Sequence, residues 1–134
     1  MISLAEMESM LNKIVDEFPP ELFKELNGGV ILLPDAKIHP DVKDNNLYIL
    51  GEYHAERSLG RYIAIYYGSF IRVYGYLDEN GIKENLIRIL KHEITHHIES
   101  LAGEKDLERK DLKHLEDYLQ NNWGIKYEVK VCKK

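Results

Sequence analysis

The segment LIRILKHEITHHIESLAG, residues 86–103, decides how the chain folds. Its apolar residues recur every three or four positions, which is the spacing of an amphipathic helix. At about 100° per residue, one stripe collects Leu86, Leu90, Ile94, His97, Ile98 and Leu101. Further isoleucines beside the stripe widen it, so we expect a helix that is buried on more than one side. The pattern predicts a helix from about residue 82 to 102 that stops at Gly103.

Of the pattern His92-Glu93-x-x-His96, the two histidines lie on the side of this helix opposite the stripe. Two histidines four residues apart stand one turn from each other, so both imidazoles can reach one Zn²⁺ at about 2.0–2.1 Å. Glu93 is then placed to take a proton from an attacking water and to pass it to a leaving amine. The same pattern arises by chance in charged helices, but histidines on a largely buried helix line a cleft. The sequence therefore favours a zinc site.

His97 follows the second histidine but falls on the apolar stripe. A buried histidine is usually held by hydrogen bonds. We therefore predict a core histidine that supports the site or contacts substrate, and we do not count His97 among the metal ligands.

Length and composition limit the classes of protein that fit. A chain of 134 residues fits one domain, residues 1–134, with a core that needs no structural metal, so any zinc is expected to be catalytic. Cys132 is the single cysteine and cannot form an internal bridge, and charged residues interrupt the apolar residues of positions 1–18. We expect a cytoplasmic protein. The net charge of −5 without a basic run argues against nucleic acid or membrane as a partner.

Local patterns outside the long helix predict further elements. We expect helices over residues 4–18, 20–26 and about 107–121, and strands over residues 30–33, 47–50, 61–67 and 71–77, with a weak edge strand over residues 125–131. Helices and strands do not alternate regularly along this order. It predicts one α+β domain.

The histidine segment is followed by Gly103 and Asp106 and preceded by Leu50-Gly51-Glu52-Tyr53 and Ile65-Tyr66-Tyr67-Gly68-Ser69-Phe70. With these residues the chain resembles the small bacterial zincin-like metallopeptidase family over residues 30–106. The resemblance implies a minimal zincin fold, in which a short mixed sheet packs on the zinc helix between N- and C-terminal helices. It also implies zinc ligation by His92 and His96 and a catalytic Glu93. The strand at residues 61–67 would be the sheet edge that holds an extended peptide.

The third zinc ligand is where the chain departs from the family pattern. A catalytic zinc site needs a third protein ligand beside two histidines and a water. The family places Gly three residues after the second histidine and Asp three later, whereas here Glu99 takes the glycine position. Gly103 and Asp106 follow four residues late. Asp106 stays the first candidate and can ligate only if the chain folds back sharply at Gly103.

Two glutamates are the alternatives to Asp106. Glu99 lies on the metal side of the helix, but a further turn along, where orienting a histidine or contacting substrate is favoured over ligation. Glu116 belongs to the predicted last helix, where zincins of the neutral-protease type carry a glutamate ligand. Each also has an ordinary structural reading: Asp106 as a helix cap, Glu99 as a salt-bridge partner and Glu116 as a solvated charge.

Tyr53 and His54 are weaker candidates, as donors at the mouth of the cleft that stabilise an oxyanion. For any one tyrosine a core or surface role is more common, since the chain has nine. The leading hypothesis is a cytoplasmic zinc-dependent peptidase that carries one Zn²⁺ per chain and acts on a peptide or protein substrate. The alternative is a metal-binding or protein-interaction domain that keeps this fold with an incomplete catalytic site.

Overall fold

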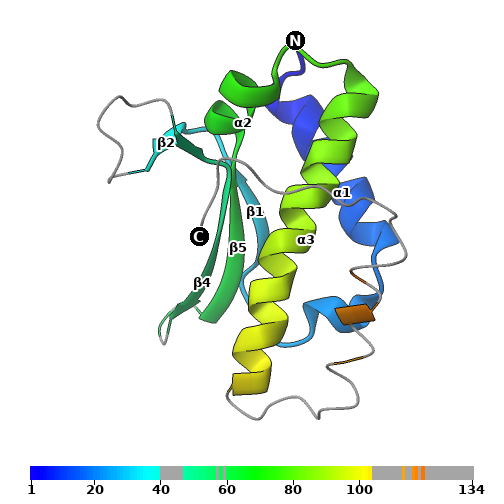
Figure 1. The fold of residues 1–134 in the computed structure, drawn as a ribbon, viewed down its shortest axis with the longest axis vertical. Helices are drawn as coiled ribbons and strands as arrows, with labels where there is room; N and C mark the ends of the chain where they lie inside the picture. Colours follow the sequence, from blue (N-terminus) through cyan, green and yellow to red (C-terminus); the bar gives the residue numbers. More distant parts are fainter. Residues whose placement is uncertain are drawn as a thin grey trace.

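The computed structural model describes residues 1–39, 47–56, 58 and 60–103, together with residues 113, 116, 117 and 119. The elements follow the order α1 (Leu4–Glu17), η1 (Pro20–Phe23), β1 (Gly29–Leu33), β2 (Lys37–Ile38), β3 (Tyr48–Ile49), β4 (Gly51–Glu56), β5 (Gly60–Tyr66), α2 (Tyr67–Tyr74) and α3 (Glu79–Gly103). The long helices α1 and α3 lie on one side of the sheet formed by β1, β5 and β4 (Figure 1). The predicted α+β class is confirmed.

The main sheet is mixed and has the strand order β1-β5-β4. Strand β1 runs parallel to β5, with Gly29 opposite Tyr62, and β4 runs antiparallel to β5, with Gly51 opposite Ile65. Strand β5 is therefore central among the described strands. The expectation that residues 61–67 form a sheet edge was wrong, because strand order is set by long-range pairing that the local sequence does not encode. Strands β2 and β3 form a separate antiparallel pair.

Helix α2 occupies most of the segment for which a strand over residues 71–77 was predicted, and that prediction was wrong. The chain turns tightly against residues 35–37 here: a Cβ atom on Gly68 would come within 2.6 Å of the Ala36 nitrogen. The Ser69 hydroxyl accepts a hydrogen bond from the Lys37 amide at 2.6 Å and donates one to the Lys37 carbonyl at 3.2 Å. These contacts and the burial of Phe70 override the β-propensity of the local residues.

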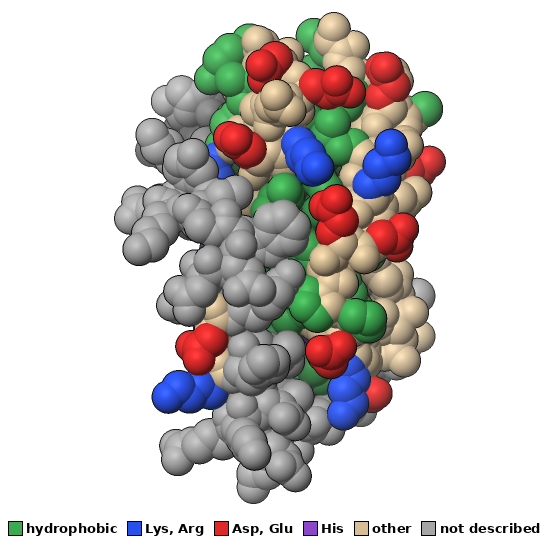
Figure 2. All heavy atoms as spheres, turned by 90° about the vertical axis from the view of Figure 1, so that its right-hand side faces the viewer, with side chains coloured by type: hydrophobic (Ala, Val, Ile, Leu, Met, Phe, Trp, Pro, Cys, Tyr) green, Lys and Arg blue, Asp and Glu red, His purple; other side chains and the backbone are tan. Residues whose placement is uncertain are grey.

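Helix α1 begins with a capping box. The Ser3 hydroxyl accepts a hydrogen bond from the Glu6 amide at 3.1 Å, and the Ser3 amide donates to the Glu6 carboxylate at 2.9 Å. Because the Glu6 carboxylate accepts the hydrogen bond from the Ser3 amide, the pKa of this carboxyl lies below its ordinary value. One face of the helix is buried, while acidic and basic side chains are interspersed over the surface on the α1 side (Figure 2). The predicted helix over residues 4–18 is confirmed.

Helix α3 is the central support of the fold and runs over Glu79–Gly103, slightly longer than predicted. The Asp78 carboxylate accepts a hydrogen bond from the Gly81 amide at 2.8 Å near its N-terminus. Its buried apolar residues are Ile82, Leu86, Ile87, Ile89, Leu90, Ile94, Ile98 and Leu101. All of them except Leu101 pack with α1 and the inner face of the sheet in one hydrophobic core. This face contains the whole predicted apolar stripe.

The predicted last helix and edge strand lie almost wholly outside the described residues. Residues 113, 116, 117 and 119 are helical, and Leu119 is buried in the core. Among the helices in the described part of the chain, none is both long enough and apolar enough to cross a membrane.

Candidate functional site

His92 and His96 lie on successive turns of α3 with their imidazole rings edge to face, at a centroid distance of 4.8 Å. The Nε2 atoms of both rings are shielded from solvent, and Nε2 of His96 has no hydrogen-bond partner in the described part of the chain. Buried polar atoms are nearly always satisfied. A shielded imidazole nitrogen without a hydrogen-bond partner, beside a second histidine, is what a metal ligand requires. The chemistry of the pair therefore fits zinc.

Glu99 contacts His96 through the other ring nitrogen. Its carboxylate oxygen Oε1 lies 3.6 Å from His96 Nδ1, an ion-pair distance, and the Glu99 side chain is 59% exposed. The contact leaves Nε2 of His96 on the shielded side. A carboxylate on the nitrogen that does not bind metal orients the ring and raises its basicity. The position of Glu99 therefore favours orientation of His96 over direct ligation.

Glu93 is fully buried and lies beneath the start of strand β4. A Cβ atom added to Gly51 would come 3.4 Å from Glu93 Cγ and 3.1 Å from Ile89 Cγ2. The bare backbone of Gly51 therefore allows β4 to lie directly against α3 at the level of Glu93. Sequence reasoning missed this role, although a glycine inside a strand often signals close approach of another element.

His97 joins three parts of the fold and is fully buried, as the apolar stripe predicted. Its Nε2 lies 2.7 Å from the Lys24 carbonyl, and its Nδ1 lies 2.9 Å from the Tyr53 hydroxyl. Because a carbonyl only accepts, Nε2 carries the hydrogen and Nδ1 accepts from Tyr53. Burial lowers the pKa of His97, against the opposing effect of the Lys24 carbonyl. Both nitrogens are thus occupied by protein groups.

Tyr53 and His54, predicted to flank one cleft, point to opposite faces of the sheet. Successive side chains of a strand alternate between faces. Tyr53 bonds His97 on the α3 side, whereas His54 contacts Glu52 on the outer side, away from α3. The structure therefore does not bring His54 together with Glu93, and it places Tyr53 as the donor that holds His97.

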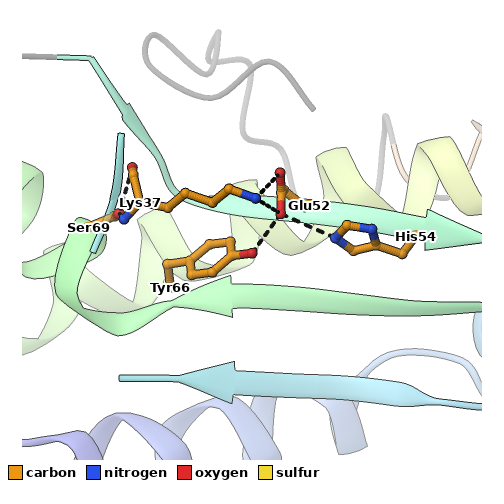
Figure 3. A network of polar contacts seen from close by, with 5 residues as sticks. All are labelled: Lys37, Glu52, His54, Tyr66 and Ser69. Carbon is orange, nitrogen blue, oxygen red and sulfur yellow. Dashed lines mark hydrogen bonds and ion pairs between the residues drawn. The ribbon is translucent and has the colours of Figure 1, made fainter. Parts of the chain in front are cut away.

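The outer side of β4 carries a second buried carboxylate, which sequence reasoning also missed. Glu52 is 1% exposed and binds Lys37 through both oxygens at 2.8 Å. Its Oε1 also accepts from the Tyr66 hydroxyl at 2.6 Å and lies 3.2 Å from His54 Nε2. Figure 3 shows these side chains converging on Glu52 from three segments. The charged residue inside the apolar run at positions 47–53 was the available signal.

The electrostatics of this network follow from its contacts. Burial alone would raise the pKa of Glu52, but hydrogen bonds from Lys37 and Tyr66 outweigh it and hold the pKa below its ordinary value. Burial and donation to this carboxylate raise the pKa of Tyr66. Glu52 is therefore ionised, Tyr66 is neutral, and the ammonium of Lys37 balances the charge.

The described residues do not show where the predicted third zinc ligand lies. Asp106, the first candidate, lies outside them, and Glu116 is partly buried in a helical position. Over residues 1–39, 47–56 and 60–103 and the few described positions beyond, no group of three or more His, Cys, Asp or Glu side chains is arranged to hold a metal ion. The choice among Asp106, Glu99 and Glu116 stays a prediction.

Comparisons with known proteins give a structural relative without an assigned activity. No protein-family model and no curated protein matches the chain. A solved structure described as a conserved hypothetical protein (TTHA0227) from Thermus thermophilus matches with a TM-score of 0.66 and 31% sequence identity, over 76% of this chain and 99% of that chain. The chain belongs to the same family as this hypothetical protein.

Proposed function

We propose that this protein is a zinc-dependent metallopeptidase with a minimal zincin fold. The observation that carries the proposal is the pair His92 and His96, whose shielded Nε2 atoms lie on one helix face with the buried Glu93 next in sequence to His92. Two imidazoles and a neighbouring carboxylate form the donor set and general base of a metal-assisted hydrolase. The resemblance to zincin-like peptidases supports the same assignment.

In this proposal each residue has one task. His92 and His96 hold the zinc ion, and Glu99, whose carboxylate lies 3.6 Å from Nδ1 of His96, is placed to orient that ring. When bound, zinc supplies Lewis-acid chemistry that polarises a carbonyl and makes water a nucleophile at neutral pH. Glu93 accepts the proton of the attacking water and transfers it to the leaving amine. The third protein ligand is a carboxylate, for which Asp106 is the first candidate, and it completes the site.

Contacts of α3 with strand β4 and through His97 hold Glu93 and the two proposed zinc ligands in position. Gly51 lets β4 lie against Glu93, and the bonds of His97 to Tyr53 and Lys24 fix the next turn of α3 against β4 and the segment after η1. A general base must lie within hydrogen-bond reach of the proton it takes, so such packing affects the rate. His97 and Tyr53 are positioning residues in this scheme.

The substrate is a peptide or protein, and the proposed location is the cytoplasm. The net charge of −5 without a basic run supports a partner other than nucleic acid or an anionic membrane. The single cysteine agrees with a reducing compartment.

The proposal is tested by metal analysis and by hydrolysis of an unbiased peptide library. We expect about one zinc per chain in the parent protein, and Glu93→Gln should keep the metal while hydrolysis falls at least about 100-fold, the scale of general acid–base catalysis. Glu84→Gln makes the same change at an exposed position of α3 and should leave both values unchanged. A Glu93→Gln variant as active as the parent contradicts the proposal. Bound zinc with no hydrolysis by the parent protein supports the metal-binding alternative.

A further inference from the structure

The outer face of the sheet contains a cavity of about 300 Å³ on the side away from α3. Three aliphatic and three aromatic side chains dominate its lining: Ile31, Leu33, Ala64, His54, Tyr62 and Tyr66. They come from β1, β4 and β5 and share one face, since Ile31 pairs with Ala64 and Leu33 with Tyr66 across the parallel ladder. Ligand sites in proteins have this make-up, mostly apolar with a few placed polar groups.

The Glu52 network at the edge of this cavity fixes the orientation of His54. An ionised carboxylate accepts hydrogen bonds and cannot donate them, so Nε2 of His54, 3.2 Å from Glu52 Oε1, carries the hydrogen. In the neutral ring, Nδ1 is then an acceptor. No other described residue forms a hydrogen bond with Nδ1. His54, one of the residues that line the cavity, therefore carries one acceptor nitrogen of defined identity.

Packing holds this acceptor in place. The His54 ring stacks on Tyr62 with a centroid distance of 4.8 Å and an interplanar angle of 18°. Gly28 allows the chain to pass close behind Tyr62, because a Cβ atom on Gly28 would lie 2.7 Å from Tyr62 Cβ. Fixing a polar group before binding reduces the entropy lost on binding. The imidazole is thus preorganised beside the cavity.

Size and charge define the class of ligand. With about 30 Å³ per water-sized atom, a cavity of about 300 Å³ accommodates about ten non-hydrogen atoms. The ammonium of Lys37 already balances the Glu52 carboxylate at 2.8 Å, so the described residues around the cavity offer no unbalanced charge to an ion. Flat aromatic walls favour a planar ligand, because stacked and edge-to-face ring contacts are attractive.

We propose that this cavity is a binding site for a small, uncharged, planar aromatic ligand that donates one hydrogen bond to His54 Nδ1. The site is separate from the proposed zinc site, because Tyr53 and Gly51 of the same strand face α3. It does not depend on the proposed peptidase activity.

Indole is the probe, because it has nine non-hydrogen atoms and one N–H donor. The full-length protein is titrated with indole and with 1-methylindole, with and without EDTA, while NMR chemical shifts are followed. We expect saturable shifts at Tyr62, Tyr66 and His54, unaffected by EDTA. Binding of 1-methylindole should be at least about threefold weaker, because the hydrogen bond to Nδ1 is lost.

Variants separate the cavity from general surface binding. Ile31→Trp places a large ring at the cavity mouth and should abolish the shifts. Ile38→Trp is the matched control, because both isoleucines are 37% exposed and only Ile31 lines the cavity. His54→Phe keeps a ring on Tyr62 but removes the acceptor, so both probes should bind it equally. The proposal is overturned by the absence of saturable shifts, by equal binding of both probes to the parent, or by equal loss in the two tryptophan variants.

Discussion

The two faces of strand β4 each carry a buried carboxylate region, and the two regions differ in how their polar atoms are satisfied. On the outer face, Lys37, Tyr66 and His54 all contact Glu52. On the inner face, β4 lies against Glu93, and Nε2 of the neighbouring His96 is shielded without a hydrogen-bond partner among the described residues. Closed networks of charged groups are typical of structural roles. A shielded imidazole nitrogen without a hydrogen-bond partner, as on the inner face, is typical of a metal ligand.

The alternation of residues in one strand produces this separation. Gly51 and Tyr53 face α3, while Glu52 and His54 face outward. Neighbouring residues of one short strand thus line two chemically distinct regions, one on each face of the sheet. Substitutions in β4 should affect one face while the other face keeps its contacts, and the following predictions use this property.

The largest effect on stability is expected from Gly51→Val. The new side chain would press on Ile89 and Glu93, which lie 3.1 Å and 3.4 Å from even a single Cβ atom. Overpacking of this kind costs about 1–3 kcal/mol. If the protein is the proposed peptidase, hydrolysis should also fall as β4 moves away from Glu93. Urea unfolding measures the stability. Gly103→Ala is the control, because no described residue lies within 4 Å of its added Cβ. A control as unstable as Gly51→Val contradicts the close approach.

Glu52→Gln tests the outer face and should lower the free energy of unfolding by about 1–2 kcal/mol at pH 7, because Lys37 loses its anionic partner. The loss is not larger, since the Lys37 side chain is 41% exposed and water screens its charge. The folded-state pKa of Glu52 lies below its unfolded value, so its contribution is present above the unfolded pKa of about 4.3. It is lost as the pH falls through the folded pKa. Acid unfolding of the variant should therefore depend less steeply on pH below about 4.3. Unchanged acid unfolding would contradict the assigned network.

Tyr53→Phe tests the inner face and is expected to have the smallest effect, about 1 kcal/mol, because it leaves His97 Nδ1 without the Tyr53 donor. Thermal unfolding measures this change. If Tyr53 positions the helix, kcat should fall while the zinc content stays unchanged. Tyr76→Phe, at a side chain that is 83% exposed, should change neither value. A loss in Tyr76→Phe equal to that in Tyr53→Phe would exclude the positioning role.

Local patterns were sufficient for the parts of the fold that depend on periodicity. The stripe of α3 predicted its burial and the core position of His97, and Pro19-Pro20 predicted the end of α1. Helix α2 was missed, because contacts between Ser69 and Lys37 determine it across 32 residues of sequence. The central place of β5 and the Glu52 network depend on pairing of distant segments, which local patterns do not contain.

The most direct test of the peptidase account is an anomalous-scattering map at the zinc absorption edge, from crystals of the protein supplied with zinc. The account predicts one peak within about 2.0–2.1 Å of Nε2 of both His92 and His96, with a carboxylate completing the ligand set. It also predicts no peak at His54 on the outer face. A map without a peak between His92 and His96, or with zinc bound at His54 instead, would contradict it.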